Sequence, residues 1–208
     1  MTGRAGGGRP ARPRVAIAHD YLTQRGGAER VVLAMARAFP DARIHTTLYD
    51  PSGTYPEFAD HEVVTSPLNR IGPVRRDHRI GLPLLAPAAS AMSVDADVTL
   101  VSSSGWAHGF RHTGRSLVYC YSPARWLYQS ETYLGGPATR SLRGMGLLAL
   151  RPALRRWDRR AARTSASETA IARLKIENGF EKMLSAEIGP EDLRHMNLRI
   201  RDLPEKEV

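Results

Sequence analysis

The chain has 208 residues, of which 42% are hydrophobic and 25% are charged, and its formal net charge is +9. These proportions fit a globular protein with a full core and exclude a disordered or fibrous class. No stretch approaches the ~18 uncharged apolar residues that a membrane-spanning helix requires. The single cysteine, Cys120, excludes an internal disulfide. Because Cys120 lies in a predicted buried strand, we expect it to pack in the core.

Residues 1–13 are basic and rich in glycine. This composition predicts a disordered arm, and the arm lacks the apolar centre of a secretory signal, so we expect a cytoplasmic protein. A short apolar run at residues 15–18 then predicts the first strand. From Ala28 to Phe39 apolar residues recur at helical spacing, and Pro40 follows, which predicts an amphipathic helix.

Gly26 and Gly27 lie between this strand and this helix. Two adjacent glycines allow a positive φ and the close approach of a ligand, and the first amides of a helix have no partner inside it. The pattern therefore indicates an anion site, to which the helix dipole contributes only ~0.3–1 kcal/mol. The alternative is a strand-to-helix turn that needs glycine for tight packing, because the loop is neither a G-x-G-x-x-G fingerprint nor a Walker loop.

Further along the chain, short apolar runs alternate with helical segments. We expect strands at residues 43–48, 62–65, 97–102 and 117–121, and a helix interrupted by proline at residues 82–92. This alternation predicts right-handed crossovers and an α/β fold, with a mostly parallel, Rossmann-like sheet and helices on both faces. Polar residues at the carboxyl ends of the strands then share one rim of the sheet, where such folds bind their ligands.

Polar residues from three predicted strands meet at this rim. Asp20 follows the first strand, Ser103 and Ser104 follow the strand at 97–102, and Tyr121 ends the last strand, with Arg125 just beyond. We expect these residues to contact a sugar or an anionic acceptor, although a serine cluster suits a turn equally well. A tyrosine with its ordinary pKa of about 10 is a poor base at neutral pH, so no catalytic residue is assigned.

Three motifs occur together: HDYLTQRGGAERVV at residues 19–32, VSSSGWAHGF at 101–110 and YCYSPARWLYQSETYL at 119–134. In this order they resemble the N-terminal domain of the retaining GT-B glycosyltransferases of family four, over residues 14–163. The resemblance implies sugar transfer from a nucleotide-sugar donor to a lipid-linked or polysaccharide acceptor, without a metal ion or other cofactor. It also implies that Gly26 and Gly27 approach the donor diphosphate, and it places Tyr121 where many relatives have a histidine.

Eight arginines and one acid, Asp158, lie between Arg140 and Arg163. The apolar residues of this segment recur at helical spacing, which predicts a helix with one apolar stripe and one cationic face. They are Leu147, Leu150, Leu154, Trp157 and Ala161. The stripe either packs on the sheet or touches the inner face of an anionic membrane, where each basic residue contributes ~1 kcal/mol. Nucleic acid is the least favoured partner, because no aromatic-interleaved motif accompanies the charge.

Residues 164–208 differ from the preceding chain. They hold all three lysines, and their net charge is −2, against +11 for residues 1–163. The segment predicts a divergent helical tail, too short for a second Rossmann-like domain, and no glutamate pair shows the E-x7-E spacing of the family's donor site. We therefore expect a glycosyltransferase half at residues 14–163 that lacks its donor domain and is inactive alone. The alternatives are a non-catalytic acceptor-binding module or subunit that needs a separate donor-binding domain, and a truncated gene product.

Overall fold

The computed structural model describes residues 13–121, 124–128 and 142–168. In this part of the chain five strands form one parallel sheet in the order β3-β2-β1-β5-β7, and β4 and β6 form a two-stranded parallel ribbon. The strands are β1 Val15–His19, β2 Arg43–Thr46, β3 Val63–Thr65, β4 Ser93–Val94, β5 Val98–Ser103, β6 Arg111–His112 and β7 Arg115–Cys120. The fold is therefore α/β with a Rossmann-like parallel sheet, as the alternating segments predicted.

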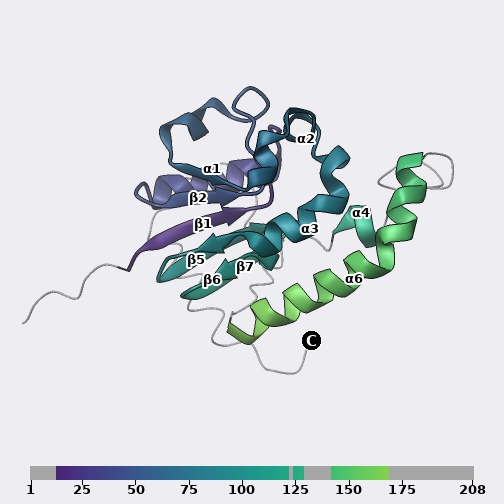
Figure 1. Ribbon diagram of the computed structural model, residues 1–208. Coiled ribbons are helices and arrows are strands. Elements are labelled where there is room, and N and C mark those ends of the chain that lie inside the picture. Colours follow the sequence, from purple (N-terminus) through teal and green to yellow (C-terminus); the bar gives the residue numbers. More distant parts are fainter. Residues whose placement is uncertain (1–12, 122–123, 129–141, 169–208) are drawn as a thin grey trace, which may run out of the picture.

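Helices cover both faces of this sheet (Figure 1). They are α1 Gly27–Ala38, α2 Gly72–Arg76, α3 Leu82–Ala91, α4 Arg125–Tyr128 and α6 Leu142–Glu168, with 3-10 turns η1 Pro56–Asp60, η2 Pro67–Arg70, η3 His78–Gly81 and η4 Ala107–Gly109. The predicted strands, the first helix and the helix at 82–92 all occur, with their ends shifted by at most two residues. The β4-β6 ribbon was not predicted, because two residues per strand carry no periodic pattern.

Alternate residues of β1 point to opposite faces of the sheet and enter different hydrophobic clusters. Ile17 is fully buried in one cluster with Val32 of α1. Ala18 is fully buried in the other with Leu85 of α3 and Leu154 of α6. One face of the sheet is therefore covered by α1, and the other by α3 and α6.

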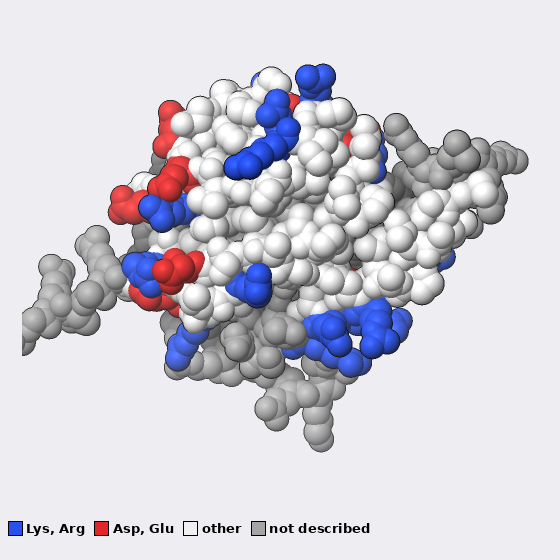
Figure 2. Space-filling model, viewed as in Figure 1, with Lys and Arg blue, Asp and Glu red and all other residues white. Residues whose placement is uncertain are grey.

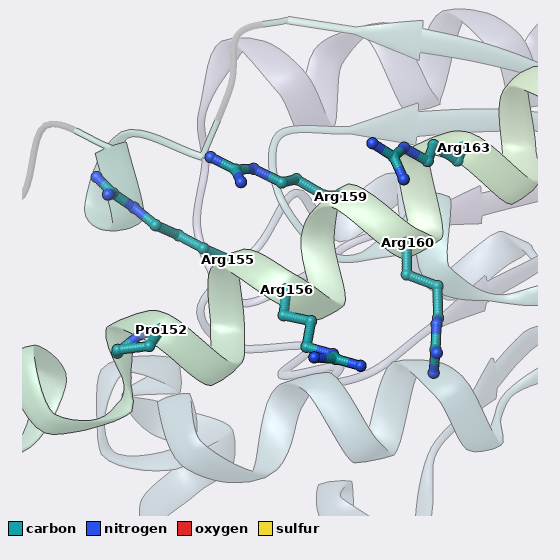
Figure 3. A pocket seen from close by; sticks show the side chains of 6 residues that line it. All are labelled: Pro152, Arg155, Arg156, Arg159, Arg160 and Arg163. Carbon is teal, nitrogen blue, oxygen red and sulfur yellow. The ribbon is translucent and has the colours of Figure 1, made fainter.

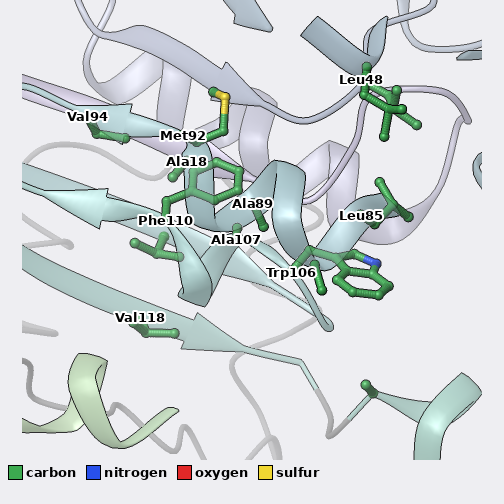
Figure 4. Packing of buried hydrophobic residues seen from close by; sticks show 14 of the residues in the cluster. Ala18, Leu48, Leu85, Ala89, Met92, Val94, Trp106, Ala107, Phe110 and Val118 are labelled. Atoms are coloured by element: carbon green, nitrogen blue, oxygen red, sulfur yellow. The ribbon is translucent and has the colours of Figure 1, made fainter. Parts of the chain in front are cut away.

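The α3 side of the core combines small side chains with two large aromatic ones (Figure 4). Ala18, Ala89 and Ala107 are buried where α3 and η4 meet the sheet, and their small size lets backbones approach closely. Trp106 and Phe110 fill the remaining space and are almost completely buried. This packing fixes η4, which directly follows the polar residues at the end of β5.

The predicted arginine-rich helix forms as α6, and part of its apolar stripe packs on the protein, which is the first of the two alternatives. Leu154 is buried, and the Trp157 ring lies 5.5 Å from that of Trp106. A Cβ on Gly109 would lie 2.4 Å from the Trp157 ring, so only glycine allows this approach. Leu150, by contrast, is 36% exposed.

Arg163, after which the divergent tail was expected to begin, lies inside α6, which continues to Glu168. The prediction that Cys120 packs in the core was wrong, because Cys120 is exposed as the last residue of β7, which pairs only with β5 among the described strands. The predicted arm up to residue 12 and the tail beyond residue 168 lie outside the described residues. Among the described helices, none has both the length and the apolar content to cross a membrane.

Candidate functional site

The strand order reverses between β1 and β5: the chain first builds β2 and β3 on one side of β1 and then crosses to β5 on the other. Loops at such a switch point run in opposite directions, which opens a crevice at the carboxyl ends of the strands. The first turn of α1 and the ends of β1, β5 and β7 lie at this edge. The structure thus brings Asp20, Ser103, Ser104 and Tyr121 to one rim, together with Gly26 and Gly27.

Asp20 is buried at this rim and organises the loop after β5. Its carboxylate accepts hydrogen bonds from the backbone amides of Ser104, Trp106 and Ala107 at 2.7, 2.9 and 2.6 Å. The hydroxyls of Ser103 and Ser104 donate to it as well, at 3.2 and 2.9 Å. Both carboxylate oxygens therefore accept hydrogen bonds that hold the loop after β5 in place. Ser104, which is partly exposed, is better placed than Asp20 or the buried Ser103 for the expected sugar contact.

His19 and Glu29 form a buried pair between β1 and α1. Nε2 of His19 lies 3.9 Å from Oε1 of Glu29, and both side chains are at most 2% exposed. Burial opposes the charged form of His19, but the hydrogen bond and charge of Glu29 and the charge of Asp20 outweigh it, and the pKa of His19 is raised. Burial likewise opposes the charge on Glu29, but His19 outweighs it, and the pKa of Glu29 is lowered. Each member of the pair therefore favours the charged form of the other.

Sequence reasoning assigned no role to Glu29, although a signal was present. Glu29 lies three residues after Gly26, the N-cap of α1. This is the position from which a glutamate folds back over the start of its helix. The pairing with His19 carried no such signal, because it depends on how β1 and α1 are placed in space.

The two glycines have different surroundings. Gly26 is extended, with φ −110° and ψ −179°, and neither glycine adopts the left-handed conformation that glycine allows. A Cβ on Gly26 would lie 2.5 Å from Oε2 of Glu29, whereas a Cβ on Gly27 would meet nothing within 4 Å. Gly26 thus fits the packing alternative, and Gly27 leaves open space at the first turn of α1.

Two exposed arginines flank this opening. Arg25 donates from Nε to the carbonyl oxygen of Thr54 at 2.9 Å, and Arg30 donates from Nε to the hydroxyl of Tyr55 at 2.8 Å. These bonds hold the stems of both side chains beside the start of α1. The two arginines and the helix N-terminus each favour an anion at this opening, and the buried carboxylates of Asp20 and Glu29 oppose it.

Tyr121 ties β7 to α1 through a directional set of hydrogen bonds. Its hydroxyl donates to the carbonyl oxygen of Ala28 at 3.2 Å and lies 2.9 Å from Oγ of Ser102. Nδ1 of His19 lies 2.9 Å from the same Oγ. Burial is the main cause that raises the pKa of Tyr121 far above its ordinary value. Tyr121 is therefore a neutral positioning residue. For Arg125, the first residue of α4, the side chain lies outside the described part of the chain.

A second polar chain runs from this rim to α6. Oγ of Ser103 lies 3.0 Å from Nδ1 of His108, and Nε2 of His108 lies 3.2 Å from Oδ1 of Asp158. The hydroxyl of Tyr128 donates to Asp158 at 2.7 Å. A serine, a histidine and an aspartate in a row suggest nucleophilic catalysis, but Ser103 is only 1% exposed and its hydroxyl donates to Asp20. The chain therefore anchors α6 to the sheet.

The cationic face of α6 surrounds a surface hollow (Figure 3). Arg156 and Arg160 extend from one side of the helix, and Arg155 and Arg159 from the other. Pro152 and Arg163 also line the hollow. Among the described residues, no three His, Cys, Asp or Glu side chains are grouped as they would need to be to hold a metal ion.

Comparisons with family models, with curated proteins and with solved structures found no match to this chain.

Proposed function

We propose that this chain supplies the acceptor-side half of a retaining GT-B glycosyltransferase of family four, acting in the cytoplasm. Such an enzyme moves a sugar from a nucleotide-sugar to a lipid-linked or polysaccharide acceptor, without a metal ion. The observation that supports this most strongly is the open start of α1 at the switch point, with Gly27 facing free space and Arg25 and Arg30 beside it.

In this proposal the first-turn amides of α1 and the two arginines hold the diphosphate of the donor. Arginine suits this role because its fork of donors matches phosphate oxygens. The hydroxyl of Ser104 then contacts a sugar, while Asp20, Ser103 and Tyr121 keep the rim in shape. Tyr121 takes no part in proton transfer, since its raised pKa keeps it neutral.

Transfer requires a second, donor-binding half in the proposed mechanism. Closure of a cleft brings both halves onto the transition state, and enzymes lower their barriers by ~8–23 kcal/mol in total. A helix N-terminus contributes ~0.3–1 kcal/mol per contact, so the described domain supplies a small part of this. We accordingly expect the domain alone to bind a nucleoside diphosphate weakly, with a Kd on the order of 1 mM.

A non-catalytic acceptor-binding module is the second candidate. It is favoured because three polar residues of the rim make hydrogen bonds within the protein itself. They are Asp20, Ser103 and Tyr121. The two candidates share the acceptor site and differ in the diphosphate site, which an experiment can separate.

Calorimetric titration of the protein with uridine and guanosine diphosphates tests the proposal. Gly27→Glu places a carboxylate in the open space at the start of α1, where it favours the helix but repels an anion. Gly72→Glu is the matched control, because Gly72 is also the first residue of a helix and a Cβ there meets nothing within 4 Å. We expect Gly27→Glu to abolish binding and Gly72→Glu to leave it unchanged. No binding by the unaltered chain, or equal loss in both variants, would contradict the diphosphate site.

A further inference from the structure

The outward face of α3 is apolar and lies uncovered among the described residues. No charged residue occurs from Ile80 to Val94, a stretch that contains the whole helix. Leu85 and Ala89 point into the core, whereas Leu84 and Ile80 are each 47% exposed. Pro83, Pro87 and Ala91 are exposed along the same helix. A contiguous exposed apolar patch with a polar rim is typical of an interaction surface, unlike single apolar residues scattered over a surface.

Arginines border this apolar face on two sides. Arg76 of α2 and Arg79 of η3 are exposed just before α3. On the other side α3 adjoins α6, where Nε1 of Trp157 donates to Oγ of Ser90 at 2.8 Å and Arg156 is exposed. Figure 2 shows an uncharged expanse with arginines above and below it. The visible acidic residues gather mainly at the left of this view.

We propose that the α3 face, defined as Ile80, Leu84 and the exposed prolines with Arg76 and Arg156 at its border, docks on an anionic lipid bilayer. Apolar side chains enter the boundary between headgroups and acyl chains, while arginines pair with lipid phosphates. A second copy of this chain is a poorer occupant, because two cationic borders would face each other. Nucleic acid is poorer too, because the centre of the face offers no cation or hydrogen-bond donor to a phosphate chain.

Docking on this face places the bilayer near the candidate site. His78 of η3 stacks on Tyr21, which directly follows Asp20, with ring centroids 4.0 Å apart. A lipid-linked acceptor at the switch point would therefore lie close to the membrane surface. The docking itself does not depend on glycosyl transfer, and it is tested without donor or acceptor.

The experiment is co-sedimentation of the full chain with vesicles of phosphatidylcholine alone and of phosphatidylcholine mixed with phosphatidylglycerol. We expect binding to the anionic vesicles only. Leu84→Glu should weaken it about tenfold, because a carboxylate must then enter the headgroup region. Arg76→Ala and Arg156→Ala should each weaken it about fivefold.

Arg37→Ala is the matched control for Leu84→Glu, because both lower the net charge by one unit and Arg37 is exposed on α1, on the other face of the sheet. Arg37→Ala should leave binding unchanged, and circular dichroism checks that every variant is folded. Absence of vesicle binding overturns the proposal, as does an equal loss in Leu84→Glu and Arg37→Ala. A dimer in sedimentation velocity that Leu84→Glu dissociates, without vesicle binding, assigns the face to a second copy instead.

Discussion

The pKa values of two histidines on opposite faces of the sheet shift in opposite directions. On the α1 side, His19 is buried next to Glu29, and its pKa is raised. On the α3 side, burial and the nearby His45 lower the pKa of His112 in the β4-β6 ribbon to about 4. A neighbouring carboxylate thus outweighs burial at His19, whereas burial prevails at His112.

Removal of Asp20 should have the largest effect, because its carboxylate holds the loop after β5 against the end of β1. Asp20→Ala leaves three backbone amides without their acceptor, two of them buried, and each buried unsatisfied group costs about 1–3 kcal/mol. We expect a loss of about 3–5 kcal/mol in the free energy of unfolding, measured in urea. Asp20→Asn keeps one acceptor oxygen and should lose less. Equal stability of the alanine variant and the unaltered protein would contradict this role.

Glu29→Gln tests the pair that Glu29 forms with His19. It removes the carboxylate that favours the charged form of the buried His19, and we expect a loss of about 2–3 kcal/mol. The contribution of His19, whose pKa is raised, is present below pH 6.5 and is lost as the pH rises through its folded pKa. That of Glu29, whose pKa is lowered, is present above pH 4.5 and is lost as the pH falls through its folded pKa.

The difference between Glu29→Gln and the unaltered protein should therefore be greatest between about pH 4.5 and 6.5. Urea unfolding across this range measures it. Glu57→Gln, at an exposed position in η1, is the control and should show no such window. A difference that does not vary with pH would mean that Glu29 acts by packing alone.

His112→Gln tests the second histidine, whose pKa is lowered by burial. The folded pKa of about 4 lies below the ordinary value of 6.5, so the unfolded chain binds the proton more tightly. The unaltered protein should therefore lose roughly 2 kcal/mol as the pH falls from 6.5 to 4, and the variant should lose less over the same range. Thermal unfolding at several pH values measures this, with His61→Gln as the control. Identical acid profiles for His112→Gln and the unaltered protein would refute the assignment.

The smallest effect should separate the two glycines. Gly26→Ala pushes a Cβ against the carboxylate of Glu29 and should cost about 1–2 kcal/mol. Gly27→Ala meets open space in a helical conformation and should be neutral or stabilising by up to ~1 kcal/mol. Urea unfolding of the two variants compares them directly. The reverse order would place the packing role at Gly27.

Much of the fold was predictable because it rests on local patterns. The apolar runs of β1 and β5 are too long for turns, and so is the helical spacing of α1. The alternation of strands and helices then predicts a parallel sheet. The position of the rim then follows from topology alone. What remained open at Gly26 and Gly27 was a matter of close contacts, which spacing does not encode.

The polar partnerships were not predictable in the same way. Asp158 contacts His108 across fifty positions of sequence, and Glu29 contacts His19 across the loop between β1 and α1. Exposure of the α3 face was equally hidden, because an uncharged helix such as residues 82–91 is expected to be buried on all sides. Each of these contacts depends on how the helices and strands are placed in space. The residues could be read from the sequence, but their contacts could not.

The most direct test of the central claim is an NMR titration of the isotopically labelled chain with uridine diphosphate. It compares two cationic regions of one molecule, the start of α1 and the arginine face of α6. We expect the largest amide shifts at Gly27, Ala28 and Ser104, with little change along α6. Shifts concentrated from Arg155 to Arg163, or none at all, would contradict a diphosphate site at the switch point.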